Sequence, residues 1–290
     1  MKKVSVVIPT YNHSSYVLDA IKSVKASEGV EAEIVVVNDG SPDDSHELLK
    51  DLPGIRYFLT ENRGAHAALN FGIEKSTHEI IAILNDDDLF SPEHLLGSIL
   101  ELEATGADIV ISRYEAFGEG KFLEQIRNHT KIADQRIGQF GLLKTLLQIN
   151  WAVSTSSFTF RRGVFQATGG FSSLTMCHDY EFLLSALVNS QAAIFYSNRT
   201  DWLYRCHDQN SSHSVNQEDR RAQWYAATFV SYEFLPQHIQ AYLSEIALEH
   251  LGIDSELLDR ILIALSTVER SEINLGVERI KKLLISPKKI

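Results

Sequence analysis

The sequence predicts an α/β fold with a mostly parallel central sheet flanked by helices, because short apolar runs alternate with helical patterns. Strands are expected at residues 4–8, 33–38, 55–59, 79–84 and 108–112. Helices are expected between them, at residues 14–27, 41–52, 64–76 and 91–106. The apolar residues of each strand follow one another without alternation, which indicates that helices cover both faces of the sheet.

Serine, proline and glycine residues indicate where several of the elements begin and end. Ser41–Pro42 and Ser91–Pro92 are each expected to begin a helix, with serine as the N-cap and proline as the first helical residue. The pattern weakens from 114 to 137, where FGEGKF predicts a turn or a flexible loop. Beyond it, the sequence predicts a helix at 138–149, a strand at 154–162, a turn at Gly169–Gly170, a helix at 178–190, and strands at 192–197 and 201–207.

The C-terminal residues follow a purely helical pattern. Helices are expected near 217–234, 236–250, 254–267 and 272–284, so a domain boundary is predicted near 215, with a helical extension at 216–290. Apolar residues at helical spacing predict packing against the body of the protein or against a second subunit, as in a homo-oligomer. The end of the chain carries Arg279, Lys281, Lys282, Lys288 and Lys289, which form either a solvated basic tail or a contact with anionic lipid.

Composition excludes several classes of function. The chain has 290 residues and a formal charge of -11, from 27 Lys and Arg against 38 Asp and Glu, which argues against a broad nucleic-acid surface. No apolar run approaches the roughly 20 residues that cross a bilayer, and the first residues are unlike a signal peptide, so the protein is expected to be cytoplasmic. Cys177 and Cys206 are expected to be ordinary reduced thiols.

Polar segments follow four of the expected strands, namely PTYN (9–12), NDGS (38–41), TENRG (60–64) and NDDD (85–88). Ligands of parallel sheets bind beyond the carboxyl ends of the strands, so these segments predict one site. No glycine-rich phosphate loop is present, which leaves a divalent cation as the means of holding a diphosphate. The triplet Asp86, Asp87 and Asp88 suits that role, because two carboxylates about 4 Å apart repel by roughly 4 kcal/mol without a cation.

These motifs resemble, in order and spacing, the inverting family 2 glycosyltransferases with a GT-A fold. The resemblance covers residues 3–213 and rests on VSVVIPTYN, VVNDGSPD, NRGAHAALNFG, ILNDDDLFSP, TGGF, HDYEFLL and YRCHDQNSS. Asn38 and Asn85 stand where the family commonly has acids, and Leu69 stands where a basic residue often precedes the asparagine. The resemblance implies a glycosyltransferase domain at 1–215, with a nucleotide-binding half at 1–88 and an acceptor half at 89–215.

The resemblance also implies roles for individual residues. Thr10 and Tyr11 would line the nucleoside pocket, and Asp39 would accept a hydrogen bond from the base. Asp86 would reach the ribose, and Asp87 would be the principal ligand of Mn²⁺ or Mg²⁺. The predicted nucleotide-sugar site comprises Pro9, Thr10, Tyr11, Asn12, Asp39, Asn62, Arg63, Asn70, Asn85 and Asp86, and the predicted metal ligands are Asp87, Asp88 and His207.

Transfer with inversion requires a carboxylate that deprotonates the acceptor hydroxyl. By resemblance this base is Asp179, and burial must supply its basicity, since a helix N-terminus tends to lower its pKa. Arg63 and Arg205 are candidates for contact with the diphosphate. The alternative interpretations are structural: Asp179 as a helix cap, His207 as a solvated loop residue, Tyr11 as packing and Asp39 as a turn former.

The sequence thus predicts a metal-dependent inverting glycosyltransferase that uses a nucleotide diphosphate sugar, most simply a uridine diphosphate sugar. A saccharide or lipid-linked saccharide in surface polysaccharide assembly would accept the sugar, the latter at the inner face of a membrane. One alternative is a non-catalytic nucleotide-sugar-binding module that acts through its helical C-terminal region. The other, a nucleotidyltransferase, would need a glycine-rich loop with Lys or Arg after the first strand, which this sequence lacks.

Overall fold

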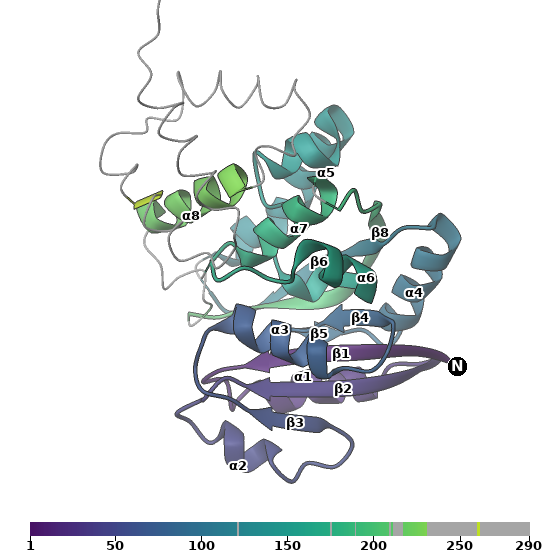
Figure 1. Ribbon diagram of the computed structural model, residues 1–290, viewed down its shortest axis with the longest axis vertical. Helices are drawn as coiled ribbons and strands as arrows, with labels where there is room; N and C mark the ends of the chain where they lie inside the picture. Colours follow the sequence, from purple (N-terminus) through teal and green to yellow (C-terminus); the bar gives the residue numbers. More distant parts are fainter. Residues whose placement is uncertain are drawn as a thin grey trace, which may run out of the picture.

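The structure is a computed structural model that describes residues 1–120, 122–174, 176–188, 190–208, 210, 217–230 and 260–261. Within these ranges, eight strands form one mixed sheet in the order β3-β2-β1-β4-β7-β6-β8-β5 (Figure 1). Parallel pairs join β1 to β2 and β4, β2 to β3, and β6 to β8, whereas β7 and β5 run antiparallel to their neighbours. The strands are β1 (Lys2–Thr10), β2 (Val30–Asn38), β3 (Arg56–Leu59), β4 (Ile80–Ile83), β5 (Leu89–Phe90), β6 (Ile109–Gly118), β7 (Phe158–Arg161) and β8 (Ile194–Cys206).

Helices cover both faces of this sheet, as the continuous apolar strands predict. Val7 of β1 packs in the same core cluster as Leu69 and Ile73 of α3, whereas its neighbour Val6 packs with Val17 of α1 on the other face. In Figure 1, α3 lies in front of the sheet and α1 behind it. The helices are α1 (Val17–Lys25), α2 (Ser45–Leu49), α3 (Ala65–Lys75), α4 (His94–Thr105), α5 (Leu123–Leu146), α6 (Arg162–Thr168), α7 (His178–Val188) and α8 (Gln217–Val230).

The expected strands of the first half are confirmed, but both predicted serine caps are wrong. Helix α4 begins at His94 with Glu93 at its N-cap position, and Ser91 continues the β5 edge, where its backbone N–H donates to the Asp201 carbonyl. Helix α2 begins only at Ser45. The hydroxyl of Ser41 instead accepts the backbone N–H of Asn12, so this serine ties two strand-end loops together.

The segment with the weakest sequence pattern is regular in the structure. Strand β6 continues to Gly118, and helix α5 spans Leu123–Leu146 with a non-helical Gly141 inside it, so most of the weakly patterned segment 114–137 is strand and helix. Residues 119–120, inside the predicted FGEGKF turn, lie outside both elements. Ala133 is buried on α5, but most residues around it are polar and exposed or only partly buried, which hides the helical period. The two strands expected at 192–197 and 201–207 form one strand, β8, which carries a register shift against β6.

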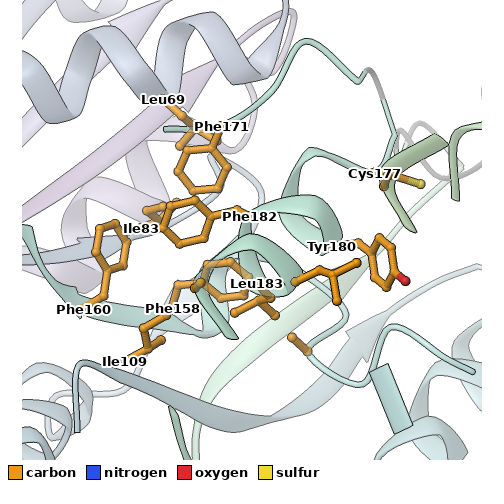
Figure 2. Close-up of a cluster of buried hydrophobic side chains, with 14 of the residues drawn as sticks. Leu69, Ile83, Ile109, Phe158, Phe160, Phe171, Cys177, Tyr180, Phe182 and Leu183 are labelled. Atoms are coloured by element: carbon orange, nitrogen blue, oxygen red, sulfur yellow. The ribbon is translucent and has the colours of Figure 1, made fainter. Parts of the chain in front are cut away.

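An aromatic cluster supports helix α7. Phe182 stacks on Phe171 with ring centroids 4.3 Å apart, and it contacts Phe160 at 5.4 Å and Phe158 at 6.1 Å (Figure 2). Phe158 and Phe160 belong to β7, so the helix is anchored to the middle of the sheet. This packing fixes the start of α7, where the predicted base Asp179 lies.

The described part of the C-terminal extension packs against the same cluster. The ring of Trp224 on α8 stacks on Tyr180 of α7 at 4.1 Å, and Thr228 bonds to the Tyr180 hydroxyl at 2.9 Å. The predicted boundary near 215, most of the later helices and the basic residues from 279 to 289 lie outside the described residues. Within the described ranges, none of the helices has the length and apolarity to cross a bilayer.

Candidate functional site

The carboxyl ends of the first parallel strands meet at one edge of the sheet. Thr10 is in register with Asn38, and Asn38 is in register with Leu59. Beyond the strands, the backbone N–H of Asp39 donates to the Thr10 carbonyl at 3.0 Å, and that of Thr60 donates to the Asn38 carbonyl at 2.9 Å. The polar segments that follow these strands therefore lie beside one another, as their positions predict.

Asp39 closes the loop that follows β3. Its two carboxylate oxygens accept the backbone N–H groups of Arg63 at 2.9 Å and Gly64 at 2.7 Å, and the side chain is buried. Each carboxylate oxygen has two acceptor positions, so Asp39 keeps the capacity to accept a further hydrogen bond. Its role as a turn former is thus compatible with the predicted contact to a nucleobase.

The two asparagines that stand in place of acids use both ends of their amides. The Oδ1 atom of Asn38 accepts the Ser41 backbone N–H at 2.8 Å, while its Nδ2 donates to the Tyr57 hydroxyl at 3.1 Å. This side chain is fully buried, and an ionised carboxylate could not act as the donor. Asn38 therefore satisfies two partners without bringing a charge into the core.

Asn85 joins the end of β4 to a turn of hydroxyl residues. Its Nδ2 donates to the Ser154 hydroxyl at 3.0 Å, and its Oδ1 accepts the Thr155 hydroxyl at 2.8 Å. The backbone N–H of Asn85 also donates to the Ser156 hydroxyl at 2.9 Å. The Asn85 amide therefore stabilises the turn at 154–156. Its predicted contact with the nucleotide sugar stays a prediction.

The three consecutive carboxylates point to three different sets of partners. Asp86 accepts the backbone N–H of Tyr11 at 3.3 Å and lies 2.8 Å from Nδ1 of His13. Burial raises the pKa of Asp86, although the hydrogen bond and charge of His13 oppose the shift. The pKa of His13 is raised in turn, because the attraction of Asp86 outweighs the effect of burial. Nearby partners thus offset part of the repulsion within the triplet.

Asp88 holds the loop rather than facing the candidate metal ligands. Its oxygens accept the Ser156 hydroxyl at 2.6 Å and the backbone N–H of Arg205 at 3.0 Å, and only 1% of the residue is exposed. Burial, followed by the charge of Asp87, raises the pKa of Asp88 well above its usual range. Within the described ranges, the group of residues able to hold a metal does not include Asp88, so its predicted role as a ligand gains no support.

Asp87 lies in a group that could hold a metal. The Oδ2 atom of Asp87 is 3.0 Å from Nε2 of His207 and accepts a hydrogen bond from Nδ2 of Asn210 at 3.2 Å. One ligand atom each from His13, Asp87 and His207 lies within 4.8 Å of the others. Two ligand atoms at right angles on an ion, each about 2.1 Å from it, are about 3.0 Å apart. The spacing of Asp87 and His207 therefore fits a divalent cation.

Arg205 brings a positive charge to this group. Its guanidinium lies between the rings of Tyr16 and Phe117, at 4.9 and 4.7 Å, and its Nε donates to the backbone carbonyl of Asp87 at 2.8 Å. A guanidinium has five N–H donors, so Arg205 can bind both the loop and an anion. This geometry agrees with the predicted contact between Arg205 and a diphosphate.

The predicted base Asp179 lies in the first turn of α7 and is buried, with 8% of the residue exposed. Asn150 donates its Nδ2 to Oδ2 of Asp179 at 2.8 Å. Burial raises the pKa of Asp179, and the charge of His178, backbone N–H groups and Asn150 only partly oppose it. Burial therefore supplies the added basicity that the sequence argument requires.

One short segment contacts both halves of the candidate site. Asn150 holds Asp179, and four residues later Ser154 holds Asn85, directly before the acidic triplet. The Cα atoms of Asn150 and Ser154 can be at most about 14 Å apart, because an extended chain advances about 3.3–3.6 Å per residue. The segment 150–156 therefore links the predicted base to the loop that carries the candidate metal ligand Asp87.

The remaining predicted residues divide into surface and buried positions. Pro9 and Thr10 belong to β1, whereas Tyr11 is 45% exposed, so packing under the sheet does not explain this ring. Asn12 has a positive φ of 59° and, like Asn62 and Arg63, is exposed beside the strand ends.

Asn70 binds the backbone of Phe171, which follows a glycine turn. Its Nδ2 and Oδ1 bond to the backbone carbonyl and N–H of Phe171, each at 2.8 Å. Gly169 and Gly170 adopt φ values of 75° and 83°, which confirms the predicted turn. Asn70 therefore fixes the turn before α7, and its predicted sugar contact stays a prediction.

Sequence patterns miss three residues of the site. His13, Asn150 and Asn210 contact Asp86, Asp179 and Asp87 respectively, across 73, 29 and 123 positions of the chain. His13 and Asn210 carry a local signal, since His13 follows directly after the first strand-end motif and Asn210 lies within YRCHDQNSS, whereas Asn150 carries none.

Comparison with known proteins agrees with this geometry. The family model described as Glycosyl transferase family 2 matches residues 5–169. An uncharacterised glycosyltransferase of Rickettsia typhi is 31% identical over 232 residues, which cover 76% of this chain and 70% of that protein. The succinoglycan biosynthesis protein ExoO of Rhizobium meliloti is 36% identical over 115 residues, or 39% of this chain and 33% of that protein.

Some relatives are much longer than the matched region. An uncharacterised glycosyltransferase of Rickettsia bellii is 37% identical over 130 residues, which cover 43% of this chain and 19% of that protein. The matches to two further Rickettsia proteins each cover 22% of the relative. The chain thus spans about a fifth of the length of these relatives.

Solved structures share the fold. Staphylococcus aureus TarS in complex with UDP-GlcNAc superposes with a TM-score of 0.64 at 18% identity, covering 98% of this chain and 84% of that one. The mannosyltransferase PcManGT of Pyrobaculum calidifontis, in complex with GDP-Man and Mn²⁺, gives 0.56 at 17% identity, covering 98% and 80%. The sheet and its helices form the GT-A fold of these enzymes, and by the match over residues 5–169 the chain belongs to glycosyl transferase family 2.

Proposed function

We propose that this glycosyltransferase is a metal-dependent inverting enzyme that transfers a sugar from a uridine diphosphate sugar. The acceptor in this proposal is a saccharide or a lipid-linked saccharide of a surface polysaccharide. The contact between Asp87 and His207, 3.0 Å long and joining positions 120 residues apart, carries the proposal. It creates a spacing that suits a cation at the strand edge where the nucleotide motifs meet.

Asp87 and His207 would hold the metal, with Arg205 beside them. A divalent ion bound there supplies positive charge that stabilises the diphosphate as it leaves. The guanidinium of Arg205 is oriented by its two flanking rings and by the Asp87 carbonyl, so it is preorganised to add a second positive charge.

Asp179 would act as the general base. Its carboxylate takes the proton of the acceptor hydroxyl while the hydroxyl oxygen attacks the anomeric carbon, and the bond from that carbon to the diphosphate oxygen breaks. Attack on the face opposite the leaving group inverts the configuration. The buried, pKa-raised state of Asp179 suits a base better than it suits a simple helix cap, which would benefit from a lowered pKa.

The compounds named with similar proteins support the substrate class. TarS has been crystallised with UDP and with UDP-GlcNAc, and ExoO is named for succinoglycan biosynthesis. Asp39 is buried and accepts three hydrogen bonds, two of them on Oδ1, so its Oδ2 keeps acceptor capacity for a base edge that carries an N–H donor, as uracil does.

A thermal-shift panel of nucleotide diphosphate sugars, each with and without Mn²⁺, tests this proposal. A ligand at 100 times its dissociation constant stabilises the folded state by about 2.7 kcal/mol. We expect stabilisation that needs both Mn²⁺ and a uridine nucleotide, and that is lost in Asp87→Ala. Stabilisation by a guanosine sugar alone would overturn the donor assignment. Donor binding without transfer to free or lipid-linked acceptors would instead favour a non-catalytic binding module.

A further inference from the structure

His13 belongs to no glycosyltransferase motif in this sequence, yet it lies among the candidate metal ligands. A ring nitrogen of His13 is within 4.8 Å of the ligand atoms of Asp87 and His207. Its ring centroid is 5.5 Å from that of His207, and the two rings meet edge to face. Two imidazoles and one carboxylate therefore converge beyond the ends of β1 and β4.

The orientation of His13 is fixed by Asp86. The Asp86 Oδ1 atom lies 2.8 Å from His13 Nδ1, and its Oδ2 accepts the Tyr11 backbone N–H at 3.3 Å, which restrains the carboxylate from both sides. When Nδ1–H donates to a carboxylate, a neutral imidazole keeps its lone pair on Nε2. A carboxylate that orients a histidine in this way is the usual support of a metal-bound imidazole, and it makes the ring a stronger ligand.

We propose that His13 is a third protein ligand of the metal, positioned by Asp86, and that the resulting site selects Mn²⁺ over Mg²⁺. This inference rests on the proposed function, because the metal is the one that the nucleotide diphosphate would share. It gives Asp86 a positioning role through His13, in place of a direct contact with the ribose.

The selectivity follows from the chemistry of the ligands. Mg²⁺ prefers oxygen ligands, keeps much of its hydration and is bound in proteins through carboxylates and phosphates. Mn²⁺ shares the preference of Mg²⁺ for carboxylate oxygen and is the weakest binder of the first-row series, but as a transition metal it accepts imidazole nitrogen more readily than Mg²⁺ does. A site with two imidazoles and a single carboxylate therefore offers little that Mg²⁺ prefers.

The first experiment measures metal binding to the full chain with UDP present and absent. The fall in the electron paramagnetic resonance signal of free Mn²⁺ gives its affinity, and displacement by Mg²⁺ gives the ratio of the two affinities. We expect Mn²⁺ to bind at least tenfold more tightly than Mg²⁺. Electron spin echo spectra of bound Mn²⁺ should show coupling to nitrogens of two imidazoles. Equal affinities, or coupling to one imidazole or none, would overturn the inference.

The test variant is His13→Gln, and the matched control is His46→Gln. His46 is also partly buried, and its Nδ1 lies 2.9 Å from the Tyr57 hydroxyl, so each substitution disturbs one imidazole hydrogen bond. We expect His13→Gln to weaken Mn²⁺ binding by tenfold or more, to weaken Mg²⁺ binding much less, and to remove one nitrogen coupling. The control should change none of these quantities. Unchanged Mn²⁺ affinity in folded His13→Gln would contradict the assignment.

Asp86→Asn provides a second variant should His13→Gln fail to fold. An amide at this position can still accept from His13 Nδ1, but it cannot supply the carboxylate charge. Mn²⁺ affinity should fall by about 10–100-fold while coupling to two imidazoles persists. Unchanged affinity in Asp86→Asn would overturn the positioning role.

The inference and the proposed function can fail separately. A chain that transfers sugar but shows only one coordinated imidazole would refute the role of His13 alone. A chain that binds Mn²⁺ through two imidazoles but binds no uridine nucleotide would refute the proposed function alone. Calorimetric titration with UDP at saturating Mn²⁺, together with the transfer assay and the spin echo spectra, separates the two cases.

Discussion

The amide of Asn150 donates to Oδ2 of Asp179 at 2.8 Å, and it is placed there by the chain that leads into the turn at 154–156. The bond links the start of α7 to the segment that also holds Asn85 and Asp88. Asn150 thus stabilises the ionised form of a buried carboxylate and fixes the direction of that carboxylate. We regard it as a positioning residue for the proposed base.

Replacing Asn150 with alanine should slow transfer and move its pH dependence. A hydrogen bond to a charged group contributes about 1.5–3 kcal/mol, which corresponds to roughly tenfold or more in rate. Since Asn150 lowers the pKa of Asp179 against the effect of burial, its loss should raise that pKa further. The acidic limb of the kcat/KM profile should then move to higher pH. The exposed Asn128→Ala is a matched control and should leave the profile unchanged.

The substitution Asp179→Asn should abolish transfer, spare donor binding and make the protein more stable at neutral pH. Burial raises the pKa of Asp179 in the folded state above its unfolded value of about 3.9. Between these two values the folded state binds more protons than the unfolded state, so wild-type stability falls as pH rises through this window.

The higher free energy of unfolding of Asp179→Asn relative to the wild type should therefore be present at pH 7 and shrink toward pH 3, as measured by urea unfolding across that range. Near-normal transfer by Asp179→Asn would show that another group is the base. If the difference in unfolding free energy between the variant and the wild type did not depend on pH, burial would not destabilise the ionised carboxylate.

The strands and the edge at which they end could be predicted because their signals are local. Apolar runs such as residues 4–8 show that both faces of a strand are buried, and the polar residues behind them mark the carboxyl ends. The part of helix α5 before the predicted helix at 138–149 is not predicted, because most residues around the buried Ala133 are polar and exposed or only partly buried, so few apolar residues show the helical period.

The division of work within Asp86, Asp87 and Asp88 could not be predicted in the same way. The three residues are identical in type, so the sequence does not distinguish them. Their roles depend on partners far along the chain, which are His13, His207 and Ser156 in that order. The predicted serine N-caps are wrong for a related reason. Ser91 has the chemistry of a cap, but its backbone N–H pairs with the Asp201 carbonyl on β8, and helix α4 begins three residues later, at His94.

The contrast between Asp87 and Asp88 can be measured directly. Asp87→Ala should remove the stabilisation that UDP and Mn²⁺ confer together, while Asp88→Ala should lower the free energy of unfolding of the protein without ligand. Without Asp88, the Ser156 hydroxyl and the Arg205 backbone N–H lose their hydrogen-bond acceptor. Removal of a buried charge offsets part of this cost, so the free energy of unfolding should fall by roughly 1–3 kcal/mol. Equal losses of stability in the two variants would contradict this division.

Gly72 lies where helix α3 packs closely against strands β1 and β2, whose ends carry predicted nucleotide-binding residues. A Cβ atom at this position in α3 would lie 2.4 Å from Cγ1 of Val7 and 3.1 Å from Cγ2 of Val37, so only glycine allows the helix to approach β1 and β2 this closely. Gly72→Ala should cost about 1–3 kcal/mol of unfolding free energy, because buried strand residues cannot move aside without disturbing their neighbours.

Gly163→Ala is the matched control, since Gly163 lies in helix α6 with no atom within 4 Å of the added Cβ. Alanine is the better helix former, so this change should stabilise the protein by about 0.5–1 kcal/mol. Urea unfolding of both variants measures the two effects with opposite expected signs. A gain of stability in Gly72→Ala would mean that α3 can retreat from the sheet, and the loop at 60–64 that closes on Asp39 would then not depend on this close packing.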